Sequence, residues 1–123
     1  MLEIYSLNKA VGANAPVSFD NTSVKKGCTA TLSGASTVQL NKCGVYMVSV
    51  DASAGTSTTI QLYKNGVAQP QAQSTGTSPA FVTLVQVDKN NSCACCASPV
   101  TLQVVNTTAA TFTNINMAVT KIC

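Results

Sequence analysis

This 123-residue chain contains six cysteines, and their type and spacing make them the candidates for a chemical function. Three of them, Cys93, Cys95 and Cys96, crowd into the stretch "NNSCACCASP", whereas Cys28, Cys43 and Cys123 lie far from that cluster in the sequence. Cysteines at this density indicate a metal site, a redox centre or a set of disulfide bridges.

A metal site is only partly matched by the spacing. Cys93 and Cys96 have the Cys-x-x-Cys spacing of a zinc knuckle, but a structural zinc site needs four ligands and no second knuckle is present. Zinc or an iron–sulfur cluster stays an alternative, above all at a threefold axis where symmetry would triple a ligand. A reactive thiolate needs positive charge nearby, and only Lys89 is close in sequence.

Structural disulfides fit the pattern better. If residues 28–43 fold as a hairpin around Gly34, Cys28 and Cys43 come within disulfide reach at its open end. Closing a loop of about 15 residues stabilises a domain by roughly 3 kcal/mol. Because neighbouring residues of a strand point to opposite faces, one of the clustered cysteines could meet Cys123 while the other two pair with each other or with a neighbouring subunit. The connectivity stays open.

Catalysis is poorly supported by the residue inventory. The chain has no histidine, the usual general base near neutral pH, and its acids Glu3, Asp20, Asp51 and Asp88 are isolated from one another in the sequence. No paired-carboxylate or nucleophile-elbow pattern occurs. We therefore predict a protein that is not an enzyme and needs no cofactor.

Charged residues make up 9% of the chain, and its seven lysines are scattered singly or as one pair, giving a net charge of +3. Nucleic-acid binding needs clustered cations with interleaved aromatic residues, so it is not expected. Hydrophobic residues make up 46%. A small domain with so few charges is expected to cover part of its surface with copies of itself.

No segment approaches the roughly 20 apolar residues that cross a bilayer, so no membrane partner is expected. The start, "MLEIYSLNKAVG", lacks the pattern of a secretory signal. Dense cysteines are nevertheless unusual in a cytosolic protein. A particle that is assembled inside a cell and then released would satisfy both observations.

Apolar residues alternate with polar ones along most of the chain, and no window has helical spacing. The clearest signal is Asn65-Gly66, which predicts a two-residue type I′ hairpin turn, and Pro70 confines the strand after it to a sheet edge. The stretch 44–54 should lie inside a sheet. Further strands are predicted at 16–24, on both sides of Gly34, and at 57–73, 79–88, 98–106 and 111–122. This spacing predicts an all-β sandwich or barrel.

The first 15 residues are expected to stand apart from a domain at 16–123. They carry one short apolar stretch ahead of the turn-rich "VGANAP", which predicts an arm or an edge strand. We expect this arm to anchor the domain through Leu2, Ile4, Tyr5 and Leu7.

The run "GVYMVSVDASA…TIQLYKNGVAQ" and the last segment "TFTNINMAVTKIC" resemble strands of the tumour necrosis factor and complement-like trimeric jelly roll. That resemblance implies a jelly-roll β-sandwich of about eight to ten antiparallel strands, packed as a homotrimer. It also implies that Tyr46, in the "GVY" position, packs toward the trimer centre.

The stretch "CCASPVTLQVVNTT" is similar to small cysteine-containing jelly-roll proteins of bacteriophage heads and head fibres, and to exosporium head domains. This sequence lacks the collagen-like repeat of the exosporium proteins, which favours a virion protein over a spore-surface protein. The expectation is a bacteriophage structural protein, either a capsid decoration or a head fibre. It would be assembled in the bacterial host cytoplasm and reside in the virion, attached to a capsid or fibre protein through the arm.

Two alternatives belong to other classes. One is a carbohydrate- or receptor-binding head whose loops 55–58, 74–79 and 107–111 take a host-surface glycan, although these loops lack the tryptophan, histidine and acids that sugar and calcium sites recruit. The other is a trimer on a spore surface.

Overall fold

A computed structural model describes residues 1–27, 30–88 and 100–122 of the chain. Within these ranges the structure contains β-strands and no helix, and therefore no helix that could span a membrane. The strands are β1 (Leu2–Val11), β2 (Ala15–Pro16), β3 (Asn21–Lys25), β4 (Ala30–Ser33), β5 (Thr37–Leu40), β6 (Gly44–Ala54), β7 (Thr58–Lys64), β8 (Val67–Gly76), β9 (Ala80–Val87), β10 (Val100–Asn106) and β11 (Ala110–Lys121).

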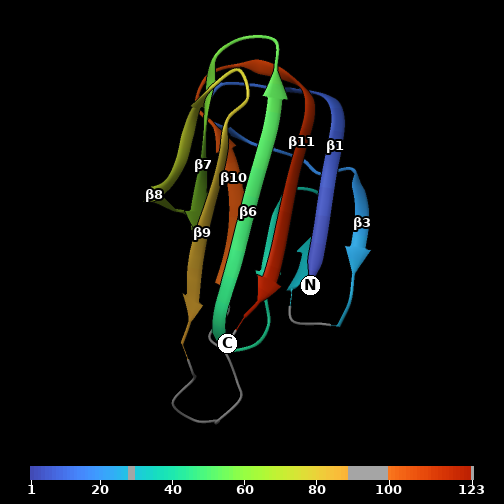
Figure 1. The fold of residues 1–123 in the computed structure, drawn as a ribbon, viewed down its shortest axis with the longest axis vertical. Coiled ribbons are helices and arrows are strands. Elements are labelled where there is room, and N and C mark those ends of the chain that lie inside the picture. The colour runs from blue at the N-terminus through green and yellow to red at the C-terminus, as the bar shows by residue number, and fades with distance from the viewer. Residues whose placement is uncertain (28–29, 89–99, 123) are drawn as a thin grey trace.

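The strands form two antiparallel sheets that pack face to face (Figure 1). Sheet A has the order β3-β1-β11-β6-β9 and is the front layer in Figure 1, from β3 on the right to β9 on the left. Sheet B has the order β4-β5-β10-β7-β8, and the short β2 pairs with β10. The predicted all-β antiparallel sandwich is confirmed. Its eleven described strands slightly exceed the eight to ten expected, because β1 and the short β2 also join the sheets.

The core lies between the two sheets and follows the period-two alternation of the sequence. In β9 every second side chain, from Phe81 to Val87, is buried, and in β6 the inward positions include Tyr46, Val48 and Val50. Sheet B contributes Leu62 and Leu102, among others, from the facing side. The strand predicted at 44–54 has the predicted bounds and lies between β11 and β9.

Both predicted hairpin turns are present. Gly34 joins β4 to β5 with a φ of 68°, a left-handed conformation that costs glycine little. Asn65 and Gly66 have φ of 51° and 80°, the pair of positive values that a type I′ turn requires. The strand after this turn, β8, is an edge strand of sheet B and contains Pro70, as predicted.

The strand predicted at 16–24 is only partly confirmed. Val17 and Phe19 are buried as their alternation predicted, but residues 17–20 belong to neither sheet. This segment carries the chain from β2 in sheet B to β3 in sheet A. Its backbone is held by hydrogen bonds from Val17 N to Val104 O at 2.8 Å and from Phe19 N to Ala35 O at 2.7 Å.

The predicted N-terminal arm needs a correction, because residues 2–11 form an interior strand. β1 lies between β3 and β11, and its register pairs Leu2 with Val119 and Ile4 with Met117. Its buried Ser6 hydroxyl donates to Ser18 O at 2.7 Å and accepts from the backbone N–H of Asp20 at 2.9 Å. A free arm would have left an apolar strand edge on β11 open, whereas β1 closes it.

Candidate functional site

Most of the cysteines that could do chemistry lie outside the described residues. These are Cys28, Cys93, Cys95, Cys96 and Cys123. Cys43 is half-buried between β5 and β6 and forms no disulfide with a described residue. The bridge between Cys28 and Cys43, like the metal alternative for the cluster, stays a prediction. Among the described residues no group of three or more metal-ligating side chains comes together.

The acidic side chains are spread over the described structure. Asp20 pairs with Lys9 at 3.2 Å at the edge of sheet A, and Asp88 follows β9. Glu3 and Asp51 both lie on the outer face of sheet A, but β11 runs between their strands. Asp51 lies within β6. This distribution offers no paired-carboxylate site.

The outer face of sheet A is the first candidate surface for function. It consists of the side chains that alternate with the buried ones, and the register places those of β1, β11, β6 and β9 side by side. Its residues in these four strands are apolar, small or polar, with Glu3 and Asp51 as the charged exceptions. Among the described residues no lysine points out from this face, so copies of it could approach without repulsion between cations.

An apolar cluster on this face is formed by Met47, Val82 and Leu84, which we call the outer patch. Met47 pairs with Leu84 across β6 and β9, and Val82 pairs with Ser49 one row along. The exposed fractions are 41% for Met47, 63% for Val82 and 59% for Leu84. Single exposed apolar residues are ordinary, but three adjacent ones on one sheet face mark a candidate contact surface.

The outer patch was not predicted from the sequence. The sequence predicts a strand at 79–88, but both faces of that strand carry apolar residues, so the sequence does not show which face is exposed. β9 is an edge strand with one face in the core. The apolar residues at its outward positions could have indicated the outer patch. Whether they are exposed, however, depends on the order of the strands in the sheet.

The residues predicted to anchor the domain are divided by the structure. Leu2 and Ile4 are buried in the core, so they cannot also contact a partner. Tyr5 is half-buried and Leu7 is exposed on the outer face of sheet A. Docking of this segment on a shell or fibre stays a prediction, and only Tyr5 and Leu7 have surface to offer it.

Tyr46 also lies elsewhere than the resemblance implied. Its side chain is buried inside the sandwich of one chain, and its hydroxyl donates a hydrogen bond to Lys42 O at 2.8 Å. Burial raises the pKa of Tyr46 above its usual value, because the phenolate is poorly solvated there. Since Tyr46 has no exposed surface, it cannot pack against a second copy, and its role is in the core.

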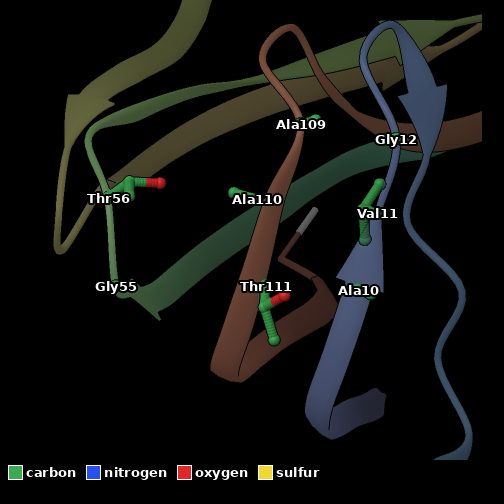
Figure 2. A pocket seen from close by; sticks show the side chains of 8 residues that line it. All are labelled: Ala10, Val11, Gly12, Gly55, Thr56, Ala109, Ala110 and Thr111. Carbon is green, nitrogen blue, oxygen red and sulfur yellow. The ribbon is translucent and has the colours of Figure 1, made fainter.

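A second candidate site is a hollow at the end of the sandwich away from the termini, which are marked in Figure 1. We call it the end hollow, and Figure 2 shows it from close by. It has a volume of about 600 Å³ and is open to solvent. Its walls come from the end of β1, the β6–β7 loop and the start of β11, and they carry small side chains: Ala10, Val11, Gly12, Gly55, Thr56, Ala109, Ala110 and Thr111.

Two of the three loops that are predicted from the sequence to bind a glycan meet at the end hollow. Loops 55–58 and 107–111 contribute to its walls, whereas loop 74–79 does not. Its polar groups are backbone atoms and the hydroxyls of Thr56 and Thr111. No aromatic side chain lines it, so the stacking surface that most sugar sites use is missing.

No protein-family model and no curated protein sequence matches the chain. Among solved structures, rabbit GITRL matches with a TM-score of 0.61 and 9% identity, over 100% of this chain and 95% of that one. A CBM35 domain from Paenibacillus barcinonensis matches with a TM-score of 0.40 and 16% identity, over 96% and 93% of the two chains. An acetyl xylan esterase from the rumen bacterium Butyrivibrio proteoclasticus matches with a TM-score of 0.36 and 9% identity, over 98% of this chain and 31% of that one.

The similarity to rabbit GITRL, a member of the tumour necrosis factor family, defines the fold of this chain as a jelly roll of that type. The expectation of such a fold from the strand patterns at 44–69 and 111–123 is therefore confirmed. At 9% identity the match is evidence for the fold alone.

Proposed function

We propose that this chain is a non-enzymatic structural module that self-associates, as a homotrimer, through the outer face of sheet A. The observation that carries the proposal is the outer patch of Met47, Val82 and Leu84 on a face without lysines. Burying these three side chains against a second copy would stabilise the assembly by about 25 cal/mol for each Å² of apolar surface removed from water. The scarcity of charge in the chain points in the same direction.

Threefold symmetry is supported by the resemblance of the sequence to trimeric jelly rolls. In a cyclic trimer each copy presents one surface to the next, so the face need not be complementary to itself across a twofold axis. The outer face of sheet A is four strands wide from β1 to β9, which offers a broad surface for such packing.

The test is the native mass of the purified chain and of two matched variants. Val82 and Val67 have the same exposed fraction, 63%, but Val67 lies on β8 in sheet B. Val82→Glu should convert the trimer to monomer at micromolar concentration, since it would bury an unpaired charge at the interface. Val67→Glu should stay trimeric. A wild-type chain that is monomeric at 100 μM, on the order of the concentration at which weak assemblies form, would sink the proposal.

For the biological setting we propose the virion of a bacteriophage, where the trimer decorates the capsid or forms a head fibre. Support comes from the similarity of "CCASPVTLQVVNTT" to phage head proteins and from the dense cysteines. Antibody raised against the purified chain should label phage particles purified by density gradient from a producing culture. Label on spores or on free protein alone would favour the other settings.

A second candidate function, glycan binding, is favoured by the end hollow. Its loops could take one small sugar residue through the hydroxyls of Thr56 and Thr111 and nearby backbone groups. A glycan array probed with the wild-type chain and with Ala110→Phe, which fills the hollow, tests this. Binding of a defined glycan by the wild type and its loss in the variant would support the second function.

A further inference from the structure

Lysines that are scattered in the sequence gather at one end of the folded sandwich. Lys25 ends β3, Lys121 ends β11, and Lys42 stands two residues before β6, all at the end that carries both termini (Figure 1). Lys26 joins them through a backbone hydrogen bond to Met1 O at 2.9 Å.

Lys64 reaches the same end from sheet B. Its Nζ donates to Gln86 O at 2.9 Å, and Gln86 pairs with Val45 at the start of β6. We call the five residues Lys25, Lys26, Lys42, Lys64 and Lys121 the basic end.

Spacing within the basic end follows from the strand register. Lys25 pairs with Leu2, which pairs with Val119, two residues before Lys121. Two strand spacings across and two residues along place the Cα atoms of Lys25 and Lys121 roughly 12 Å apart. Ammonium groups on flexible side chains at such distances act together on a partner within a Debye length of about 8–10 Å.

None of the five ammonium groups is neutralised by an ion pair in the described structure, where Lys9 and Asp20 form the ion pair that is present. Four of them are exposed, and Lys64 is half-buried. The acids nearest along the strands are Glu3 and Asp88, which accept hydrogen bonds from Ser23 and Gln86. The basic end therefore has an excess of positive charge.

The opposite end of the sandwich differs in charge. It carries the end hollow, whose walls are uncharged. The ion pair of Lys9 and Asp20 lies between the basic end and this end. Asp51 is the remaining charge in this half of sheet A. The molecule is thus polarised along its long axis.

The side chains at the basic end indicate which class of anionic partner it would bind. The chain has no arginine, so the bidentate fork that recognises phosphate is missing. No described aromatic side chain is exposed, so bases and sugars find no stacking platform. Met1 and Ile122 are exposed apolar side chains beside these lysines. Apolar groups surrounded by charged ones are typical of protein interfaces.

We propose that the basic end docks onto an acidic protein surface, one that presents aspartate and glutamate side chains around a small apolar area. This surface is distinct from the outer patch, so the chain could self-associate and dock at once. Three parallel copies would present three basic ends to one partner surface and gain avidity. The proposal stands whether or not the chain proves to be a trimer.

The experiment uses a fluorescent poly-glutamate peptide as the probe and follows binding by anisotropy at low and at physiological salt. The variant Lys25→Gln, Lys26→Gln, Lys121→Gln removes three charges from the basic end. A matched control, Thr56→Glu, Thr111→Glu, Thr113→Glu, lowers the net charge equally at exposed positions near the other end. All of these side chains are exposed, and circular dichroism verifies that both variants fold.

We expect the lysine variant to bind poly-glutamate at least about 10-fold more weakly than the wild type, with a smaller salt dependence, and the control to stay within about 3-fold. Equal losses in the two variants would mean that net charge, not the basic end, governs binding, and would overturn the proposal. Tighter binding of double-stranded DNA or of phosphatidylglycerol vesicles than of poly-glutamate would also overturn it.

Native mass measured on the same samples separates this proposal from self-association. A monomeric chain whose basic end still binds poly-glutamate contradicts the proposed trimer alone. A trimeric chain whose lysine variant binds as well as the wild type contradicts the docking proposal alone.

Discussion

The hydroxyl of Thr58 donates a hydrogen bond to Oδ1 of Asn106, and both side chains are buried where β7 and β10 meet the end hollow. Nδ2 of Asn106 donates to Val11 O at 3.3 Å, and the Thr58 hydroxyl also lies 3.1 Å from Thr108 O. One buried amide thus joins the end of β1 in sheet A to sheet B. This network holds the backbone of Val11, one of the residues that line the end hollow.

Replacing Asn106 should therefore destabilise the fold. Asn106→Ala leaves the Val11 carbonyl without its side-chain donor and the Thr58 hydroxyl with Thr108 O alone, a loss of about 1–3 kcal/mol in the free energy of unfolding. The matched control is Asn114→Ala on the exposed face of β11, expected within about 0.5 kcal/mol of the wild type. Urea denaturation measures both. Equal midpoints for the two variants would contradict the role assigned to the network.

The interior position of β1 predicts a contrast between two of its residues. Ile4→Ala removes a fully buried side chain and should cost about 2–5 kcal/mol, whereas Leu7→Ala at an exposed position should cost less than about 0.5 kcal/mol. If residues 1–15 were a free arm, neither substitution would change the urea midpoint. The same reasoning predicts that deleting residues 1–12 abolishes cooperative unfolding, because β3 and β11 lose the strand between them.

The turn at Asn65-Gly66 tests backbone strain alone. A Cβ at Gly66 would meet no atom within 4 Å, but the φ of 80° is unfavourable for alanine, so Gly66→Ala should cost about 1–2 kcal/mol. Gly12 also has open space around it and no positive φ. Gly12→Ala should be neutral or slightly stabilising, because it reduces the entropy of the unfolded chain. Thermal unfolding of the two variants under one condition gives the comparison.

Burial of Tyr46 makes stability depend on alkaline pH. The folded-state pKa lies above the ordinary value of 10.0, so the unfolded chain loses this proton first as the pH rises. The corresponding stability is fully present below pH 10 and is lost as the pH rises through the folded-state pKa.

Tyr46→Phe should flatten that alkaline decrease, at a cost of about 1 kcal/mol near neutral pH for the lost hydrogen bond to Lys42 O. Urea midpoints from neutral to alkaline pH measure it, with Tyr5→Phe as the half-buried control. An unchanged alkaline slope in Tyr46→Phe would show that Tyr46 does not cause the decrease.

Most strands and both hairpin turns of this protein can be predicted from its sequence. The strand-forming residues at 44–54 and 79–88, and the positive φ that Asn65-Gly66 tolerates, are properties of neighbouring residues, so they can be recognised without knowing the partners of a strand. The burial of Val17 and Phe19 was equally visible in their spacing, even though the segment joins no sheet.

Which strands pair, and therefore which side chains form each surface, depends on the tertiary structure. An apolar stretch such as residues 2–7 has the same pattern whether it lies at an edge or between β3 and β11, because strand pairing joins residues far apart in the sequence. For the same reason the exposure of Val82 and Leu84 depended on β9 being an edge strand with a single buried face. Lysines that are tens of residues apart became one basic end because β3, β7 and β11 finish, and β6 begins, at the same end of the sandwich.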